Sequence, residues 1–185
     1  MGMSEPAERY RTIAGQFTDR VTSVPVGAWD NPAPCEGWLA RDVVRHLCEW
    51  VPSFFQSSTG IDLPKATNVD TDPAAAWATL TEAIQALLDD PDVASREFDM
   101  PMGRMSVENA VDMIVTNDVF LHAWDLARAT GQDETLDREE VHRMFEGMEP
   151  MDDLLRQSGH YGPRVEVADD ADEQTKLIAF IGRRP

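Results

Sequence analysis

The stretch SVENAVDMIVTNDVFLHAWDLARATG, residues 106–131, decides the fold, because it predicts one long helix. Ser106 is a suitable N-cap, and Gly131 is a suitable residue just beyond a helix C-terminus. A helix of about 24 residues is about 36 Å long. Its length and apolar content make it the central element. One face, at steps of three and four residues, carries Val107, Val111, Ile114, Asp118, His122, Asp125 and Ala129.

This face changes along its length from apolar to ionisable. A solvent-exposed face is not expected to continue an apolar one, so the polar groups should point inward, where an unpaired carboxylate is costly. A cation would compensate Asp118 and His122, because residues at i and i+4 lie about 5–6 Å apart and can chelate one ion. Asp125 is either a hydrogen-bond acceptor for a ligand imidazole or the partner of Arg128.

Further amphipathic helices are expected on both sides of the central one, because apolar residues recur there at helical spacing. Pro25 follows the first helix, and Asp72-Pro73 begins the third. A polar loop precedes the third helix, and residues 92–105 should form a loop or at most a short strand. Four or five such helices with few strands imply an antiparallel bundle. The predicted helices span residues 8–24, 39–55, 73–90, 106–131, 137–159 with interruptions at Gly147 and Pro150, and 176–181.

His46 lies on the apolar face of the predicted second helix, between Val43 and Trp50. If that face meets the central helix, His46, Asp118 and His122 supply two imidazoles and one carboxylate. This set suits zinc, and also nickel, iron or manganese. Three protein ligands leave a coordination position open for water or substrate, as in catalytic sites. The plainer interpretation is a hydrogen-bonded core histidine and an ordinary Asp–His pair.

The remaining chemistry-bearing residues carry weaker signals. Cys35, in a proline-rich loop, is interpreted as a plain loop cysteine rather than a reactive thiol. Cys48 follows His46 by two residues, about 200° around a helix, and should not bind the same ion. Ligand imidazoles must be neutral, so metal affinity should fall as the pH approaches and passes below about 6.5. His142 and His160 are expected to have surface or packing roles. Core positions, rather than positions in a pocket wall, are expected for Trp38, Trp50 and Trp124.

Composition limits the class of protein. A chain of 185 residues can bury a core without a metal or disulfides, so any metal should be functional. The net charge of −18 argues against nucleic acid and anionic membranes. Two cysteines, no apolar signal segment and no long apolar run favour the cytoplasm. The expected partner is a small-molecule substrate or thiol, with neither nucleic acid nor membrane; a homodimer is left open.

Three segments carry a resemblance to a known family: CEGWLARDVVRHL (35–47), DVFLHAWDLARATGQD (118–133) and KLIAFIGRRP (176–185). Together they resemble the stand-alone DinB-like metal-binding proteins, which are related to the metal-binding domain of mycothiol-dependent maleylpyruvate isomerase. The resemblance implies an all-α, DinB-like antiparallel four-helix bundle. It implies one domain over residues 1–185, with the bundle core at about 7–157 and a short C-terminal appendage.

The resemblance also implies the metal ligands and a function. A family histidine matches His46, and the isomerase's Glu-x3-His pair falls on Asp118 and His122. Because Asp is one methylene shorter than Glu, the metal's identity and position stay open, with zinc expected and nickel the alternative. The implied function is a metal- and thiol-dependent transferase or isomerase, with mycothiol the expected thiol. Maleylpyruvate isomerisation itself is not expected, because the isomerase's C-terminal domain, which contributes to its active site, has no room here.

Two alternatives to a thiol-dependent enzyme stay open. The first is a hydrolase that uses metal-activated water, for which Asp125 or Asp42 would be a weak general base. The second is a non-catalytic metal-binding or ligand-sensing module. The substrate is not predicted.

Overall fold

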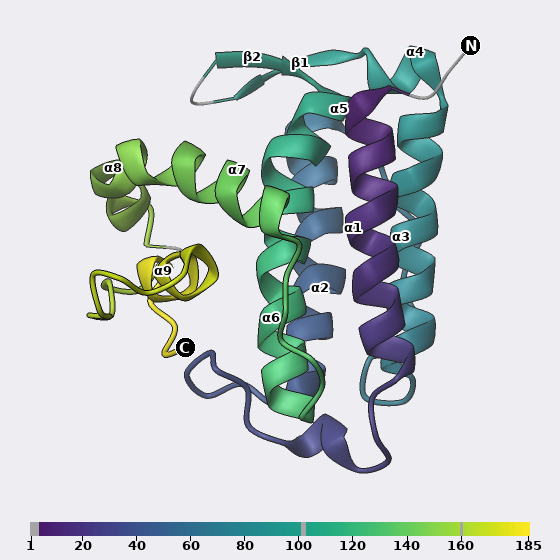
Figure 1. The fold of residues 1–185 in the computed structure, drawn as a ribbon. Helices are drawn as coiled ribbons and strands as arrows, with labels where there is room; N and C mark the ends of the chain where they lie inside the picture. The colour runs from purple at the N-terminus through teal and green to yellow at the C-terminus, as the bar shows by residue number, and fades with distance from the viewer. Residues whose placement is uncertain (1–3, 101–102, 160) are drawn as a thin grey trace.

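Four long helices stand side by side in the computed structural model, which describes residues 4–100, 103–159 and 161–185 (Figure 1). Three are single α-helices, and the fourth is a continuous run of α5, η2 and α6. The predicted all-α four-helix bundle is confirmed. The bounds are Glu5–Thr22 for α1, Ala40–Thr59 for α2, Pro73–Asp89 for α3, Val107–Ala110 for α5, Val111–Thr116 for η2 and Asn117–Thr130 for α6.

Helices α1 and α2 occupy opposite corners of the bundle, because each packs against both α3 and α6. Helix α2 runs antiparallel to α6, and α1 to α3, whereas α2 and α3 run in the same direction (Figure 1). Asp70, late in the loop of residues 60–72, pairs with Arg45 in the first half of α2. Arg96, beyond α3, donates to the carbonyl of Thr59 at the end of α2. The loop therefore returns along the bundle, which the sequence did not predict.

Capping groups explain where the long helices begin and end. The Ser106 hydroxyl accepts a hydrogen bond from the backbone N–H of Asn109, and the Asp72 carboxylate accepts one from Ala75. Gly131 has a φ of 70°, the left-handed conformation in which a helix commonly ends. These three caps are the ones predicted from the sequence.

The chain adds short helices beyond the bundle, beside α6 (Figure 1). Helix α7 ends between Gly147 and Pro150, as predicted, and packs against α9. Val165 belongs to no strand, and its N–H donates to the carbonyl of Ala179. The bounds are Arg138–Met148 for α7, Glu149–Met151 for η3, Asp152–Gln157 for α8 and Glu173–Phe180 for α9.

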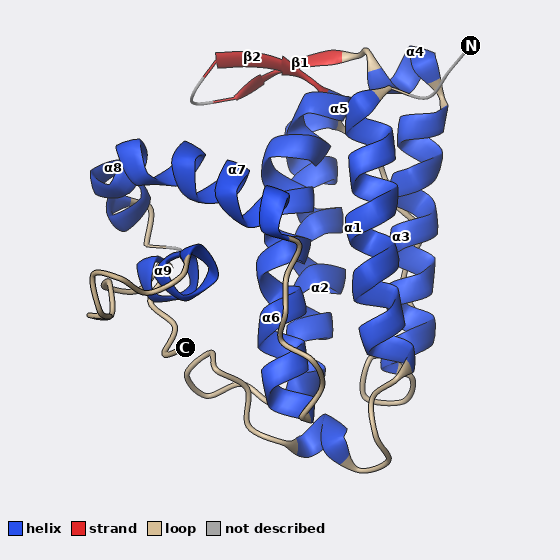
Figure 2. Ribbon diagram, in the orientation of Figure 1, coloured by secondary structure: helices blue, strands red, loops and turns tan. Residues whose placement is uncertain are grey.

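A small hairpin closes one end of the bundle (Figure 2). Its strands, β1 (Glu97–Met100) and β2 (Gly103–Ser106), are antiparallel, with Phe98 opposite Met105. A loop or at most a short strand was predicted for residues 92–105, and the structure forms two short strands there. Two further short elements are η1 (Ala28–Asp30), before α2, and α4 (Pro91–Ala94), after α3.

The central helix contains a π-helical turn, η2, that the sequence did not predict. The hydroxyl of Thr116 donates to the carbonyl of Val111, five residues earlier, at 3.0 Å. The extra residue rotates the face that follows, so Val115 is buried while Ile114, on the predicted stripe, is half-buried. Such turns are frequent at functional sites, and this one ends two residues before Asp118.

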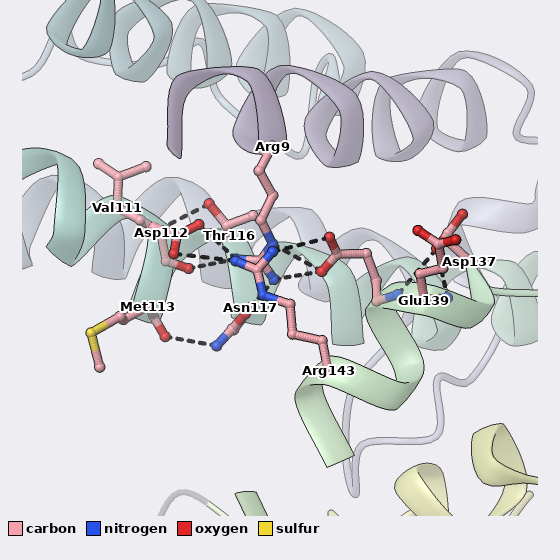
Figure 3. A network of polar contacts seen from close by, with 10 residues as sticks. Arg9, Val111, Asp112, Met113, Thr116, Asn117, Asp137, Glu139 and Arg143 are labelled. Carbon is pink, nitrogen blue, oxygen red and sulfur yellow. Dashed lines mark hydrogen bonds and ion pairs between the residues drawn. The ribbon is translucent and has the colours of Figure 1, made fainter. Parts of the chain in front are cut away.

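Arg9 of α1 fixes this turn against the neighbouring helices (Figure 3). Its guanidinium, almost wholly buried, donates to the carbonyl of Asp112 at 2.9 Å and to its carboxylate at 2.8 Å. It also donates to Asn117 Oδ1 at 2.7 Å and to Glu140 Oε2 at 2.9 Å. The network joins α1, η2, α6 and α7, and so holds the backbone immediately before Asp118.

The most buried face of α2 is not the face that carries His46. The face of His46, Trp50 and Phe54 is half-buried and lies at the edge of the bundle. The buried side of α2 comprises Ala40, Val43, Val44, Leu47, Val51 and Phe55.

In the part of the chain that the structure describes, no helix has the length and apolar character needed to cross a membrane.

Candidate metal centre

The structure brings His46, Asp118 and His122 together across the α2–α6 contact. His46 Nε2 lies 3.2 Å from Asp118 Oδ2, and His122 Nε2 lies 3.5 Å from Asp118 Oδ1. The centroids of the two imidazole rings are 4.9 Å apart. One possible ligand atom from each of the three residues lies within 4.8 Å of those of the other two residues. This arrangement follows from the i, i+4 spacing on α6 and from the antiparallel approach of α2. It is the juxtaposition that the sequence predicted.

One side of this cluster is buried and the other is open. The side chain of His122 is 6% exposed, whereas those of His46 and Asp118 are 32% and 26% exposed. The donors therefore sit at the rim of the bundle, where a small molecule can approach His46 and Asp118. The expectation that these groups point into the interior holds for His122 and only partly for the other two.

Two tryptophans line the cluster instead of filling the core. Trp38 stacks on His122, with ring centroids 5.8 Å apart, and lies 5.1 Å from His46. Trp50 donates its indole N–H to Asp118 Oδ2 at 2.9 Å. Both are half-buried, so core positions were the wrong prediction for them, whereas Trp124 is buried as predicted.

The electrostatics of the cluster favour a positive charge between carboxylates. Burial alone would raise the pKa of Asp118, but the charge of His122 and hydrogen bonding from His46 outweigh it and lower that pKa. Burial would lower the pKa of His122, but the Asp118 carboxylate and the hydrogen bond to Asp125 raise it to about 10. The donor types, their spacing and this preference for a cation fit a divalent metal ion.

Asp125 supports His122 from the side away from Asp118. Its Oδ2 atom lies 2.9 Å from His122 Nδ1, and the Arg183 guanidinium donates to Oδ1 at 2.9 Å and to Oδ2 at 3.0 Å. These contacts lower the pKa of Asp125 to about 2, against the opposing effect of burial. Of the two predicted partners, the imidazole of His122 is the one observed. The alternative partner, Arg128, pairs with Glu134 at 2.6 Å.

Cys35 lies in the loop before α2, as predicted, and is a buried neighbour of the same carboxylate. Its Sγ atom lies 3.4 Å from Asp125 Oδ2, and Cys35, His122 and Asp125 form a second group whose ligand atoms lie within 4.8 Å of one another. Cys48 belongs to neither group found among the described residues, as predicted, and burial raises its thiol pKa to about 12.

The other histidines lie elsewhere. His142 is exposed and contacts Glu173 at 2.9 Å and Glu146 at 3.6 Å, which agrees with the predicted surface role. His160 lies outside the described residues.

The C-terminal residues also reach the site, which the sequence did not reveal. Arg183 is 58 residues from Asp125, and no periodicity connects them. Burial raises the pKa of the Tyr161 phenol, and the nearby charge of Asp118 raises it further. The one available signal was the KLIAFIGRRP segment, which marked the family without indicating a contact.

Comparison with known proteins places these residues in context. The family model described as the mycothiol maleylpyruvate isomerase N-terminal domain matches residues 10–127, which include His46, Asp118, His122 and Asp125. Two uncharacterized proteins from Mycobacterium tuberculosis, one from strain CDC 1551 / Oshkosh and one from strain ATCC 25618 / H37Rv, are each 26% identical to the chain over 193 residues. Each alignment covers 97% of this chain and 98% of the relative. No solved structure matched.

Proposed function

Because the chain belongs to the mycothiol maleylpyruvate isomerase N-terminal domain family, we propose that it binds one divalent metal ion through His46, Asp118 and His122 and catalyses a thiol-dependent transfer or isomerisation of a small molecule. The observation that carries the proposal is the convergence of these side chains from α2 and α6, with ligand atoms within 4.8 Å of one another. Zinc is the expected ion and nickel the alternative.

A divalent ion held there would lower the pKa of a bound thiol and supply a thiolate nucleophile at neutral pH. The chain's own residues prepare the site for that role. Asp125 accepts a hydrogen bond at His122 Nδ1, which directs Nε2 toward Asp118. The Trp50 indole fixes the Asp118 carboxylate, and Trp38 covers the two imidazoles. The open side at His46 gives the thiol and its substrate access.

Hydrolysis is the weaker alternative, because the two candidate bases already have partners. Asp125 accepts from His122 and Arg183, as described above. Asp42 accepts from the backbone N–H of Leu39 and pairs with Arg45. A general base must be within reach of the water it activates, and neither carboxylate is free for that role.

Adding a thiol to the cobalt-loaded protein is expected to produce a sulfur-to-cobalt charge-transfer band. Three protein ligands leave a position that a thiolate can occupy, and sulfur binds cobalt well. The measurement is an absorption titration with 2-mercaptoethanol and then mycothiol. The band should be lost in His122→Ala, kept in Asp118→Glu, and kept in Cys35→Ser and Cys48→Ser, because the sulfur comes from outside.

A cobalt spectrum that stays unchanged at millimolar thiol would refute the thiol-dependent reaction. If metal still bound in that case, a binding or sensing module would become the better account. A band that disappeared in Cys35→Ser would instead show that the sulfur is the protein's own.

A further inference from the structure

His122 belongs to two overlapping groups of metal-ligand side chains. Its Nε2 atom faces Asp118 at 3.5 Å, whereas its Nδ1 atom faces Asp125 at 2.9 Å. On the Nδ1 side, the Cys35 thiol completes a second group of thiol, imidazole and carboxylate, and all three residues are buried. By donor chemistry this second group would bind zinc or cobalt at least as well as the first, because it offers sulfur.

The second group already has a cation, the guanidinium of Arg183. Two parallel hydrogen bonds, at 2.9 and 3.0 Å, engage both oxygens of Asp125. Such bidentate pairs are strong and directional. A divalent ion bound between Cys35, His122 and Asp125 would have to take an Asp125 oxygen from Arg183 and sit close to a fixed positive charge. Among the described residues, the hydrogen bonds and ion pairs of Asp118 involve His46, Trp50 and His122 and no arginine, although the charge of Arg183 also acts on Asp118 from a distance.

The backbone fixes Arg183 in this place. Gly182 has a φ of 88°, and a Cβ atom there would lie 2.9 Å from the Cα atom of Gly162, so glycine is required for both reasons. The N–H of Arg183 then donates to the carbonyl of Ile178 at 3.0 Å. The C-terminal turn therefore delivers the guanidinium to Asp125 from outside the bundle.

The loop before α2 fixes the other side of the second group. The N–H of Trp38 donates to the carbonyl of Cys35 at 3.0 Å, and the N–H of Ala33 donates to the carbonyl of Trp38 at 2.8 Å. The Asn31 side chain donates to the carbonyl of Ala129, near the end of α6, at 3.0 Å. These hydrogen bonds hold the loop, and with it Cys35, against α6.

We propose that Arg183 determines which group holds the metal: its guanidinium is the cation of the Cys35–His122–Asp125 group, and so directs a divalent ion to His46, Asp118 and His122. The inference rests on the proposed function only in assuming that the chain binds such an ion. A protein without the guanidinium should contain a second, cysteine-containing metal site at the same imidazole.

The test is the cobalt spectrum of Arg183 variants, measured without added thiol and with a phosphine reductant. Arg183→Gln should gain a sulfur-to-cobalt charge-transfer band that is absent from the parent. Arg183→Lys, which keeps the charge, and Arg184→Gln, the exposed neighbour, should lack the band. Adding Cys35→Ser to Arg183→Gln should remove it. If Arg183→Gln loses its helical circular dichroism and so fails to fold, Arg183→Met takes its place in the same measurement.

The variants also separate this inference from the proposed function. The band should persist in Arg183→Gln/His46→Ala, whereas His46→Ala alone should lose cobalt. A folded Arg183→Gln or Arg183→Met protein without the band would overturn the inference, as would a parent protein that already shows it. A parent that binds no cobalt would overturn the proposed function, while a band in Arg183→Gln/His46→Ala would still support the role of Arg183.

Discussion

Replacing His46 by alanine is expected to reduce the affinity for zinc or cobalt by about 100-fold or more, because groups that only support a metal ligand already contribute about 10- to 100-fold. His46 supplies one of the two imidazoles, and its partner Asp118 is 3.2 Å away. The fold should be unaffected, since His46 lies on the half-buried edge of α2 and not on its buried side. Competition titration against a chromophoric chelator measures the loss.

His142→Ala is the matched control for this substitution. His142 also lies between two carboxylates, Glu173 at 2.9 Å and Glu146 at 3.6 Å, but on an exposed surface. Its replacement should leave metal affinity unchanged. If His46→Ala bound metal as tightly as the parent, or if His142→Ala caused the same loss, the assignment of His46 as a ligand would be wrong.

Metal binding is expected to release at least one proton per chain at neutral pH. Burial would lower the pKa of His122, but the Asp118 charge and the Asp125 hydrogen bond raise it to about 10, so the metal-free imidazole is protonated at pH 7. Metal binding requires the neutral ring, so protons compete throughout the range below that pKa. Affinity should therefore rise roughly tenfold per pH unit from pH 7 toward about 10.

Calorimetry at a single pH, in two buffers with different ionisation enthalpies, measures the protons released. Equal heats in both buffers at pH 7.5 would contradict this expectation. The sequence alone placed the competition near and below pH 6.5, the range for an ordinary histidine. The structure raises the highest pH at which protons compete with the metal, because only the folded chain places two carboxylates against one buried imidazole.

The predictable parts of the fold are those with local signals. Ser106, Asp72 and Gly131 mark helix ends through their own backbone chemistry, and the structure uses each of them as predicted. The π-helical turn was missed, because apolar spacing of three and four residues does not reveal one extra residue. The parallel course of α2 and α3 was missed because it depends on a loop, residues 60–72, whose path has no periodicity.

The same distinction applies to the candidate site. His46, Asp118 and His122 could be predicted because each lies on a helix face that continues an apolar stripe. Arg183 could not, since it reaches Asp125 through a turn at Gly182, which packs closely against Gly162, a residue far away in the sequence. Sequence proximity suggested Arg128 as the partner of Asp125, but that side chain lies over the Trp124 ring, 4.6 Å from its centroid.

X-ray absorption at the zinc edge, with elemental analysis of the same sample, tests the central claim most directly. The zinc-loaded parent protein, prepared without thiols, should contain one zinc ion per chain, bound by two imidazoles and otherwise by oxygen. The two groups found among the described residues differ in this respect, because only the group with Cys35 would add sulfur. A zinc–sulfur distance near 2.3 Å, or the absence of bound zinc after loading, would contradict the assignment of His46, Asp118 and His122 as the metal ligands.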